Sequence, residues 1–373
     1  MRLVARLNTI TSEIYVVGYR YTPDFAMNFG SDNYAGAHSA ISASLAKHAA
    51  GYATPYSASD LDLAVQRRLS EIFERDVVVF YVATGTASNS LALASMAIPG
   101  GIVLAHREAH VIVDECGAPE HLSNQIRIVP IEGSNGKMDL TELRQQAERI
   151  ARLDVHGGRL NAISVTQPTE TGTVYSLEEL DAIADLARHY KIPIHMDGAR
   201  FANGLVSLNC SPAEMTWKRG IDILSFGATK NGCWCAEVVV LFDPNKAREF
   251  AFIQKRAGQL FSKSRFVSAQ LEAYLHNGLW IDLARHSNRM AAELAEVFSR
   301  SISSRLVRKP QSNEVFVILK KHTISMLQSA RVVLSEWPVL SELKISDDEQ
   351  LCRFVTSFAT TEGDIRHFSS LII

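Results

Sequence analysis

The sequence predicts an α/β protein built on a doubly wound, mostly parallel β-sheet. Short, nearly continuous apolar runs rich in Val and Ile recur along the chain, as expected of strands buried on both faces. Longer segments with apolar residues at helical spacing, such as Leu177–His189, separate these runs. This alternation is typical of a doubly wound sheet. The predicted strands are Val77–Val82, Ile102–Ala105, Ile126–Ile131, Ala162–Thr166, Ile192–Met196, Ile221–Phe226 and Val238–Phe242.

The pattern changes after about residue 265, which predicts a smaller C-terminal α+β domain. Two helices are expected there, Gln270–Gly278 and Trp280–Arg300, followed by the apolar run Val315–Leu319 and a last strand over Arg353–Phe358. We therefore expect an N-terminal extension over residues 1–24, a large domain over residues 25–270 and a small domain over residues 271–373.

Composition narrows the function classes. The chain has 373 residues, 47% of them hydrophobic, and a net charge of -2, so electrostatics predicts neither nucleic-acid nor membrane-surface binding. Five scattered cysteines indicate reduced thiols and a cytoplasmic location. No apolar run approaches the roughly 20 residues that span a bilayer. The segment Met1–Arg20 lacks the pattern of a secretory signal and is either a targeting peptide or an extension.

Lys230 is the first candidate for chemistry. It lies in the segment Ser225–Gly232, where a predicted buried strand ends in a Gly-rich turn, and its small neighbours would let a flat ring approach the backbone. Burial lowers the pKa of a Lys and frees its amine as a nucleophile, so this turn suits imine chemistry. The same Lys could instead lie in an ordinary surface loop.

Asp197 and Arg200 follow the predicted strand Ile192–Met196. An acid at the carboxyl end of a buried parallel strand lies where open α/β sheets bind ligands, and in enzymes that use pyridoxal 5'-phosphate (PLP) it pairs with the ring nitrogen. Arg200 could face the same crevice. The alternative is a helix-capping Asp followed by a solvated Arg.

Two further motifs fit the same cofactor. The turn around Gly85 and Thr86 precedes an apolar helix, where free backbone N–H groups suit a phosphate dianion, although plain helix capping explains it too. His110 follows another strand and could stack on a ring, although a lone His is often structural. A phosphate turn, a strand-end Asp and a turn Lys occur in the chain order of the aspartate-aminotransferase-like fold of PLP enzymes.

Several segments together resemble the low-specificity L-threonine aldolase family. The resemblance extends from about Phe29 to about Phe266 and weakens toward the C-terminus, where Arg353-Phe354 resembles the family's late substrate-binding Arg. The segments are Ser31–Tyr34, Gly85–Leu93, Ala109–Val111, Asp114–Glu120, His195–Phe201, Phe226–Gly232 and Ala257–Leu260.

The resemblance implies PLP fold type I, with a mostly parallel seven-stranded large domain, and a role for each candidate residue. Lys230 would form the Schiff base, Asp197 would pair with the ring nitrogen and His110 would stack on the ring. Gly85 and Thr86 would hold the phosphate. The family's carboxylate-binding positions correspond to Ser31, Arg200 and Arg353. Tyr56 and Arg265 correspond to positions at which the family's site is built partly by a neighbouring subunit.

The resemblance also implies the reaction. A β-hydroxy-α-amino acid such as L-threonine, L-allo-threonine or phenylserine would be cleaved to glycine and an aldehyde. Glu170 stands where some members carry a His near the substrate hydroxyl, so the base could be Glu170, His110 or a bound water. Another fold type I lyase or an aminotransferase is the alternative. A homodimer or homotetramer is expected, and no metal ion.

Overall fold

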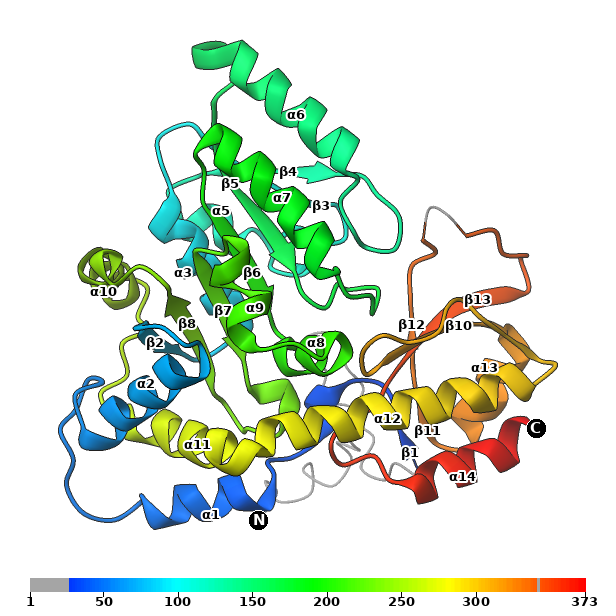
Figure 1. The fold of residues 1–373 in the computed structure, drawn as a ribbon. Coiled ribbons are helices and arrows are strands. Elements are labelled where there is room, and N and C mark those ends of the chain that lie inside the picture. Colours follow the sequence, from blue (N-terminus) through cyan, green and yellow to red (C-terminus); the bar gives the residue numbers. More distant parts are fainter. Residues whose placement is uncertain (1–26, 341–342) are drawn as a thin grey trace, which may run out of the picture.

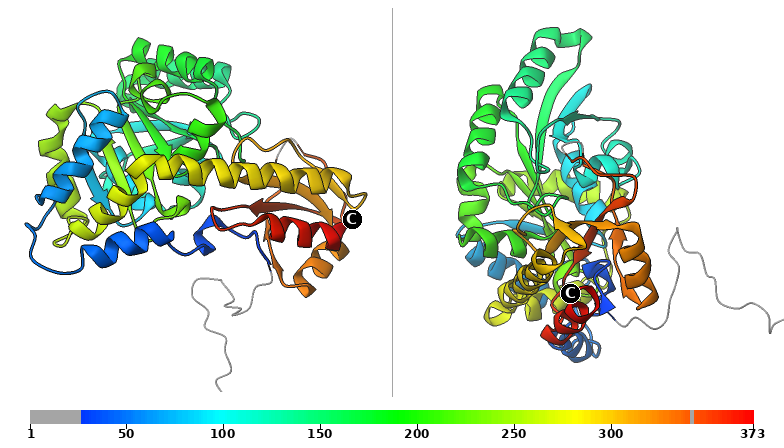
Figure 2. Two further views of the ribbon diagram at one scale, coloured as in Figure 1. Left: turned by 60° about the horizontal axis from the view of Figure 1, so that its bottom comes forward. Right: turned by 90° about the vertical axis from the view of Figure 1, so that its right-hand side faces the viewer.

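The structure, a computed structural model, describes residues 27–340 and 343–373. The predicted N-terminal extension over residues 1–24, including the segment considered as a targeting peptide, lies outside these described residues. Two domains are joined by the long helix α12 (Leu279–Arg300), which Figure 1 and Figure 2 show extending from one domain to the other.

The large domain contains the predicted seven-stranded sheet, in the order β2-β8-β7-β6-β5-β3-β4. β8 is antiparallel to both of its neighbours, and the other strands share one direction. Every strand predicted for the large sheet is present, with ends shifted by at most three residues, so the fold prediction is confirmed. The strands are β2 Val78–Val82, β3 Gly101–His106, β4 Arg127–Ile131, β5 Arg159–Thr166, β6 Ile194–Gly198, β7 Ile223–Gly227 and β8 Glu237–Leu241.

Helices cover both faces of this sheet, because its strands are apolar on both sides. Within β7, Leu224 and Phe226 enter one core while Ile223 enters the core of the opposite face. The first core includes side chains from α1 Ser39–Lys47, α2 Asp60–Ile72, α6 Leu140–Leu153, α7 Leu177–Tyr190, α8 Phe201–Leu208, α9 Pro212–Met215 and α11 Arg265–Leu275. The second includes side chains from α3 Gly85–Met96, α4 His110–Val113 and α10 Ala247–Arg256, and α5 Ala118–Leu122 packs on α3.

The small domain is an antiparallel sheet in the order β12-β13-β10-β9, packed against α12 and α14. Its core contains a cluster of aromatic rings: Phe298 lies 4.9 Å from Phe354 and 5.3 Å from Phe368 between ring centroids. A short parallel pair, β1 with β11, belongs to the same core. The elements are β1 Met27–Asn28, β9 Ser304–Leu306, β10 Glu314–Lys320, α13 Lys321–Ser329, β11 Val332–Val333, β12 Ser335–Glu336, β13 Glu349–Val355 and α14 Glu362–Ile372.

Two element predictions for the C-terminal part were wrong at their ends. The helix expected over Gln270–Gly278 begins at Arg265 and stops at Leu275, because Asn277 has a left-handed φ of 48° that an α-helix does not accommodate. The strand expected over Arg353–Phe358 is β13, which starts earlier, at Glu349, and ends at Val355, although the Thr356 N–H still bonds the Asn313 carbonyl in the same register.

The helix α12 contributes to both cores. Trp280 and Leu283, near its start, are buried in the large domain, whereas Met290 and Phe298 are buried in the small one. The predicted boundary at residue 270 lies within α11, and the division of the chain into domains at that point remains a prediction. Among the helices of the described residues, none combines the length and apolar character needed to cross a lipid bilayer.

Candidate active site

The carboxyl ends of the parallel strands bring the predicted cofactor residues to one edge of the large sheet. Asp197 is near the end of β6, and Lys230 lies in the 3-10 turn Thr229–Asn231 after β7. Gly85 begins α3 after β2, and His110 begins α4 after β3. The Lys230 ammonium interacts electrostatically with His110, so these two side chains lie in one cluster.

Asp197 is buried and fixed by two hydrogen bonds. Its Oδ1 accepts from the Ala199 backbone N–H at 3.0 Å, and its Oδ2 accepts from the Asn89 side-chain amide at 2.9 Å. The carboxylate therefore has a defined orientation at the end of its strand, which a group that must hold a proton on a ring nitrogen requires.

A chain of hydrogen bonds continues from Asp197 to His110. The Asn89 amide also donates to Glu115 Oε1 at 2.8 Å, and the same oxygen lies 2.7 Å from His110 Nδ1. Burial alone would lower the pKa of His110, but the hydrogen bond to Glu115 and the charges of Glu170 and Asp197 raise it above its usual value. Asn89 and Glu115 lie in segments that carried the family resemblance, yet no role was predicted for either.

The start of α3 offers space and donors for a phosphate. Thr84 caps the helix by accepting from the Ala87 N–H at 3.0 Å, which leaves the N–H groups of Gly85 and Thr86 in the unpaired first turn. A Cβ added at Gly85 would meet no heavy atom within 4 Å, so the backbone there borders open space. This combination suits an anion.

Glu237 is a buried carboxylate beside the Lys230 turn that sequence reasoning did not identify. Its Oε1 accepts from the Thr229 N–H at 3.3 Å. Burial raises the pKa of Glu237 to about 7, against the Thr229 hydrogen bond and the charge of Lys230. Because β8 is antiparallel, its first residue lies at the edge where the parallel strands end, opposite Gly227.

A second cluster surrounds Arg200, which is buried. Its guanidinium donates twice to Asp32, from Nε at 2.7 Å and from Nη2 at 3.1 Å, and its Nη1 lies 3.4 Å from Glu314 Oε1. Burial alone would lower the pKa of Arg200, but the charges of Asp32 and Glu314 hold it above its usual range. Ser31 precedes this cluster and caps the turn of Asp32 by accepting from the Asn33 N–H at 3.1 Å.

Arg353 and Glu170 complete this second cluster. Arg353 Nη1 lies 3.4 Å from Glu314 Oε1, and its guanidinium stacks on Trp337 at 4.1 Å from the ring centroid. Glu170, 7% exposed, interacts electrostatically with Arg200 and His110 and so lies between the two clusters. Sequence reasoning missed Asp32 and Glu314. The available signal for Glu314 was an acid directly before a predicted apolar strand.

Tyr56 and Arg265 lie elsewhere on the single chain. Tyr56 is 52% exposed, and its backbone N–H bonds the Ser262 carbonyl at 3.1 Å. Arg265 Nη1 donates to the Gly51 carbonyl at 2.9 Å. Both residues are thus held around the surface loop that precedes α2.

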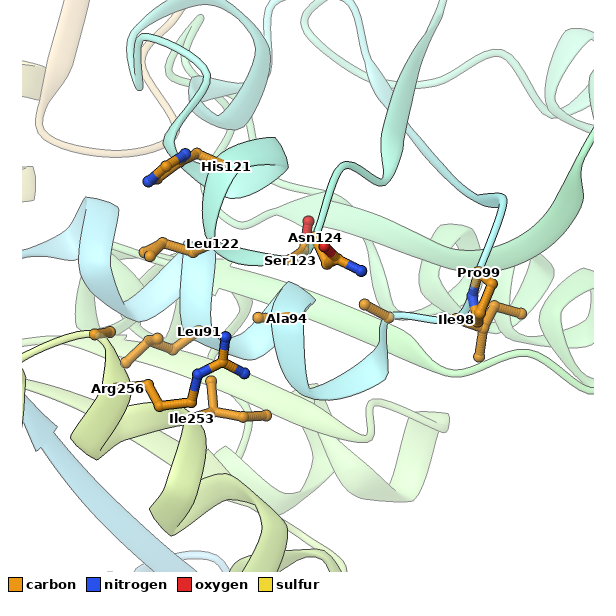
Figure 3. Close-up of a pocket in the computed structure, with 12 residues that line it drawn as sticks. Leu91, Ala94, Ile98, Pro99, His121, Leu122, Ser123, Asn124, Ile253 and Arg256 are labelled. Atoms are coloured by element: carbon orange, nitrogen blue, oxygen red, sulfur yellow. The ribbon is translucent and has the colours of Figure 1, made fainter.

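One pocket on the large domain is separate from this edge. It lies between α3, α5 and α10, with Leu91, Leu122 and Ile253 as apolar lining and Arg256 at its side (Figure 3). It borders the second half of α3, whereas the predicted phosphate site is at the first turn of that helix. None of the predicted site residues lines it.

The residues of the sheet edge fit PLP. They provide an open helix start for the phosphate, a fixed buried carboxylate for the ring nitrogen and a lysine in the same charged cluster. Fold and site together define a PLP-dependent enzyme of fold type I.

Comparison with known proteins gives the family. A model of the beta-eliminating lyases matches residues 28–322, and the chain belongs to this family. It is 37% identical to the low specificity L-threonine aldolase of Pseudomonas aeruginosa over 82% of this chain and 88% of that protein. It is 36% identical to the enzyme of the same name from Pseudomonas sp. over 93% and 97%. The solved Leishmania major threonine aldolase has a TM-score of 0.85 at 25% identity, covering 92% of this chain and 98% of that one. The resemblance predicted from the sequence is confirmed.

Proposed function

We propose that this chain cleaves L-threonine, L-allo-threonine or a related β-hydroxy-α-amino acid such as phenylserine to glycine and an aldehyde. The observation that carries the proposal is the convergence of Lys230, Asp197, His110 and Glu170 at one edge of the sheet. The similarity to low specificity L-threonine aldolases from two Pseudomonas strains supports the reaction type.

Each cofactor residue has a role that follows from its position at the sheet edge. Lys230 would carry the cofactor, Gly85 and Thr86 would bind its phosphate, and Asp197 would keep a proton on its ring nitrogen. When bound, PLP supplies the electron-withdrawing group that accepts the electrons of the broken Cα–Cβ bond. His110 would lie against this ring, and Glu115 orients the imidazole through the 2.7 Å contact at Nδ1.

Glu170 removes the proton from the substrate's β-hydroxyl. A raised pKa makes His110 a poorer acceptor, because the ring then keeps its own proton to higher pH. Glu170 is buried and close enough to Arg200 and His110 to interact with their charges, which supports a location beside the substrate. Arg353 and Ser31 hold the α-carboxylate, with Arg200 behind them.

Product analysis tests the proposed reaction. The holoenzyme incubated with L-threonine, L-allo-threonine or phenylserine should yield glycine and the matching aldehyde. Ammonia with a keto acid would instead identify a fold type I lyase of another type, and amino-group transfer would identify an aminotransferase.

The role of Lys230 is tested by substitution and by labelling. Lys230→Ala should lose nearly all turnover, and borohydride should fix the cofactor on Lys230. A label on another lysine would reject that assignment.

The variant Glu170→Gln tests the base. It should lower kcat for β-hydroxy amino acids by about 10²- to 10⁴-fold, the usual contribution of a general base, while glycine binding remains close to that of the parent. Glu178→Gln is the matched control, because Glu178 lies in the first turn of α7 on the surface. Parental rates and parental pH dependence in Glu170→Gln would make His110 or a water molecule the base.

We also propose that the enzyme is a homodimer or homotetramer. The exposed aromatic ring of Tyr56 and the nearby Arg265 support a subunit contact at the loop before α2. Sedimentation should give at least a dimer; a fully active monomer would contradict this.

We also propose a cytoplasmic location, which the five free cysteine thiols support.

A further inference from the structure

Glu314, the first residue of β10, occupies the space between the two arginines expected to bind the substrate's carboxylate. Its Oε1 lies 3.4 Å from Nη1 of Arg200 and 3.4 Å from Nη1 of Arg353. Its Oε2 is buried and has no hydrogen-bond partner among the described residues. The protein's own carboxylate thus stands where a second carboxylate would have to share the same donors.

The two arginines differ in what they can still donate. Arg200 is engaged through Nε and Nη2 with Asp32 and through Nη1 with Glu314. Arg353 Nε is buried and has no acceptor within the part of the chain that the structure describes, and leaving a buried donor unpaired is unfavourable. An incoming carboxylate would satisfy Arg353, and Trp337 holds its guanidinium plane in place for this contact.

The charges around Glu314 disfavour the binding of another anion unless one of the negative groups is neutralised. Those that face it are Arg353 from β13, Arg200 from the residue before α8, Asp32 from the turn after β1, and Glu170 from the loop after β5. With Glu314 ionised, two positive and three negative groups are present, and a substrate carboxylate would add a fourth negative one. Excess buried charge is strongly unfavourable unless a group becomes neutral.

We propose that Glu314 is a positioning residue that gives up Arg353 to the substrate's α-carboxylate and takes up a proton from solvent as it does so. The inference rests on the proposed function. Before an amino acid binds, ionised Glu314 holds both guanidinium groups in place. Once protonated, it can remain between them without opposing the new carboxylate, and no substrate bond changes in this step. Burial raises the pKa of Glu314 despite the two arginines, and Glu170 and Asp32 raise it further.

The test measures protons taken up on binding. The holoenzyme and Glu314→Gln are titrated calorimetrically with glycine near pH 8, in buffers of different ionisation enthalpy. The parent should take up close to one proton more than the variant, which should bind glycine about tenfold more tightly at this pH. Methylamine, which has the amine but no carboxylate, should show no such difference. Equal proton counts for glycine, or the same difference with methylamine, would overturn the proposal.

A second measurement on the parent alone avoids any folding defect of the variant. Because protonation of Glu314 accompanies binding, the affinity for glycine relative to methylamine should fall as the pH rises, by up to about tenfold per unit for one linked proton. A ratio that does not change with pH refutes the role of Glu314. If β-hydroxy amino acids are still cleaved to glycine, only this inference fails; if no glycine forms, the proposed function fails.

Discussion

The two ends of the active site are built differently. At the ring end, Asp197, Asn89, Glu115 and His110 all belong to the large domain and are joined by contacts of 2.7–2.9 Å. At the carboxylate end, Asp32 and Arg200 come from the N-terminal and large-domain segments, while the small domain supplies the acid and arginine that pair with each other at 3.4 Å. The comparison indicates that a preorganised ring site is combined with a carboxylate site whose geometry depends on how the two domains meet.

Among the variants that compare the two ends, Asp197→Asn should give the largest effect and should act on kcat alone. An amide does not hold a proton on the ring nitrogen, and loss of such electrostatic stabilisation costs about 10²- to 10³-fold in rate. KM should change little, because the carboxylate end is intact. Asp222→Asn is the control, since Asp222 accepts from the Ile194 N–H at 2.9 Å, at the start of β6 and far from the strand ends. Near-normal kcat in Asp197→Asn would remove the ring-nitrogen role.

Arg353→Lys should act mainly on KM, which distinguishes the two ends. Lysine keeps the charge but loses the planar fork and its stacking on Trp337, so KM for L-threonine should rise by about 10- to 100-fold, as expected for about 1.5–3 kcal/mol of a charge-assisted hydrogen bond. Arg305→Lys, an exposed substitution in the same small-domain sheet, should leave KM unchanged. Steady-state kinetics decides, and a parental KM in Arg353→Lys would contradict the assignment.

Glu115→Gln should have the smallest effect and should be visible in pH dependence. The hydrogen bond to Glu115 raises the pKa of His110 against the effect of burial, so its loss should lower that pKa. An NMR titration of the His110 imidazole should therefore move to lower pH, with kcat reduced by no more than about tenfold. An unchanged titration would show that Glu115 neither orients the His110 imidazole nor raises its pKa.

The fold of the large domain and the separate motifs could be predicted from the sequence. Each buried strand was visible as an apolar run, and Lys230, Asp197 and His110 could be placed because parallel strands end at one edge. Glu237 was not predicted, because it directly precedes the expected strand Val238–Phe242, and only the antiparallel direction of β8 brings it to the Lys230 turn.

Most contacts of the carboxylate cluster could not be predicted from the sequence, for a different reason. Asp32 and Arg200 are 168 positions apart, and Glu314 meets Arg200 only because the small domain folds back on the large one. Local patterns give the type of each residue but not which distant charges compensate one another in a buried space. The resemblance indicated Arg200 and Arg353, whereas their shared partner became visible only in three dimensions.

The continuity of α12 has a mechanical consequence for this site. The helix has 22 residues, about 33 Å at 1.5 Å per residue, and no break within it. The non-helical backbone before its first turn is at Asn277 and Gly278, while Trp280 and Leu283 fix that end in the large domain. A straight helix held at one end moves at its far end only by bending or by rotation about the held end. The position of Arg353 relative to Arg200 therefore depends in part on the stiffness of this helix, and so does the space between them that a substrate carboxylate would enter.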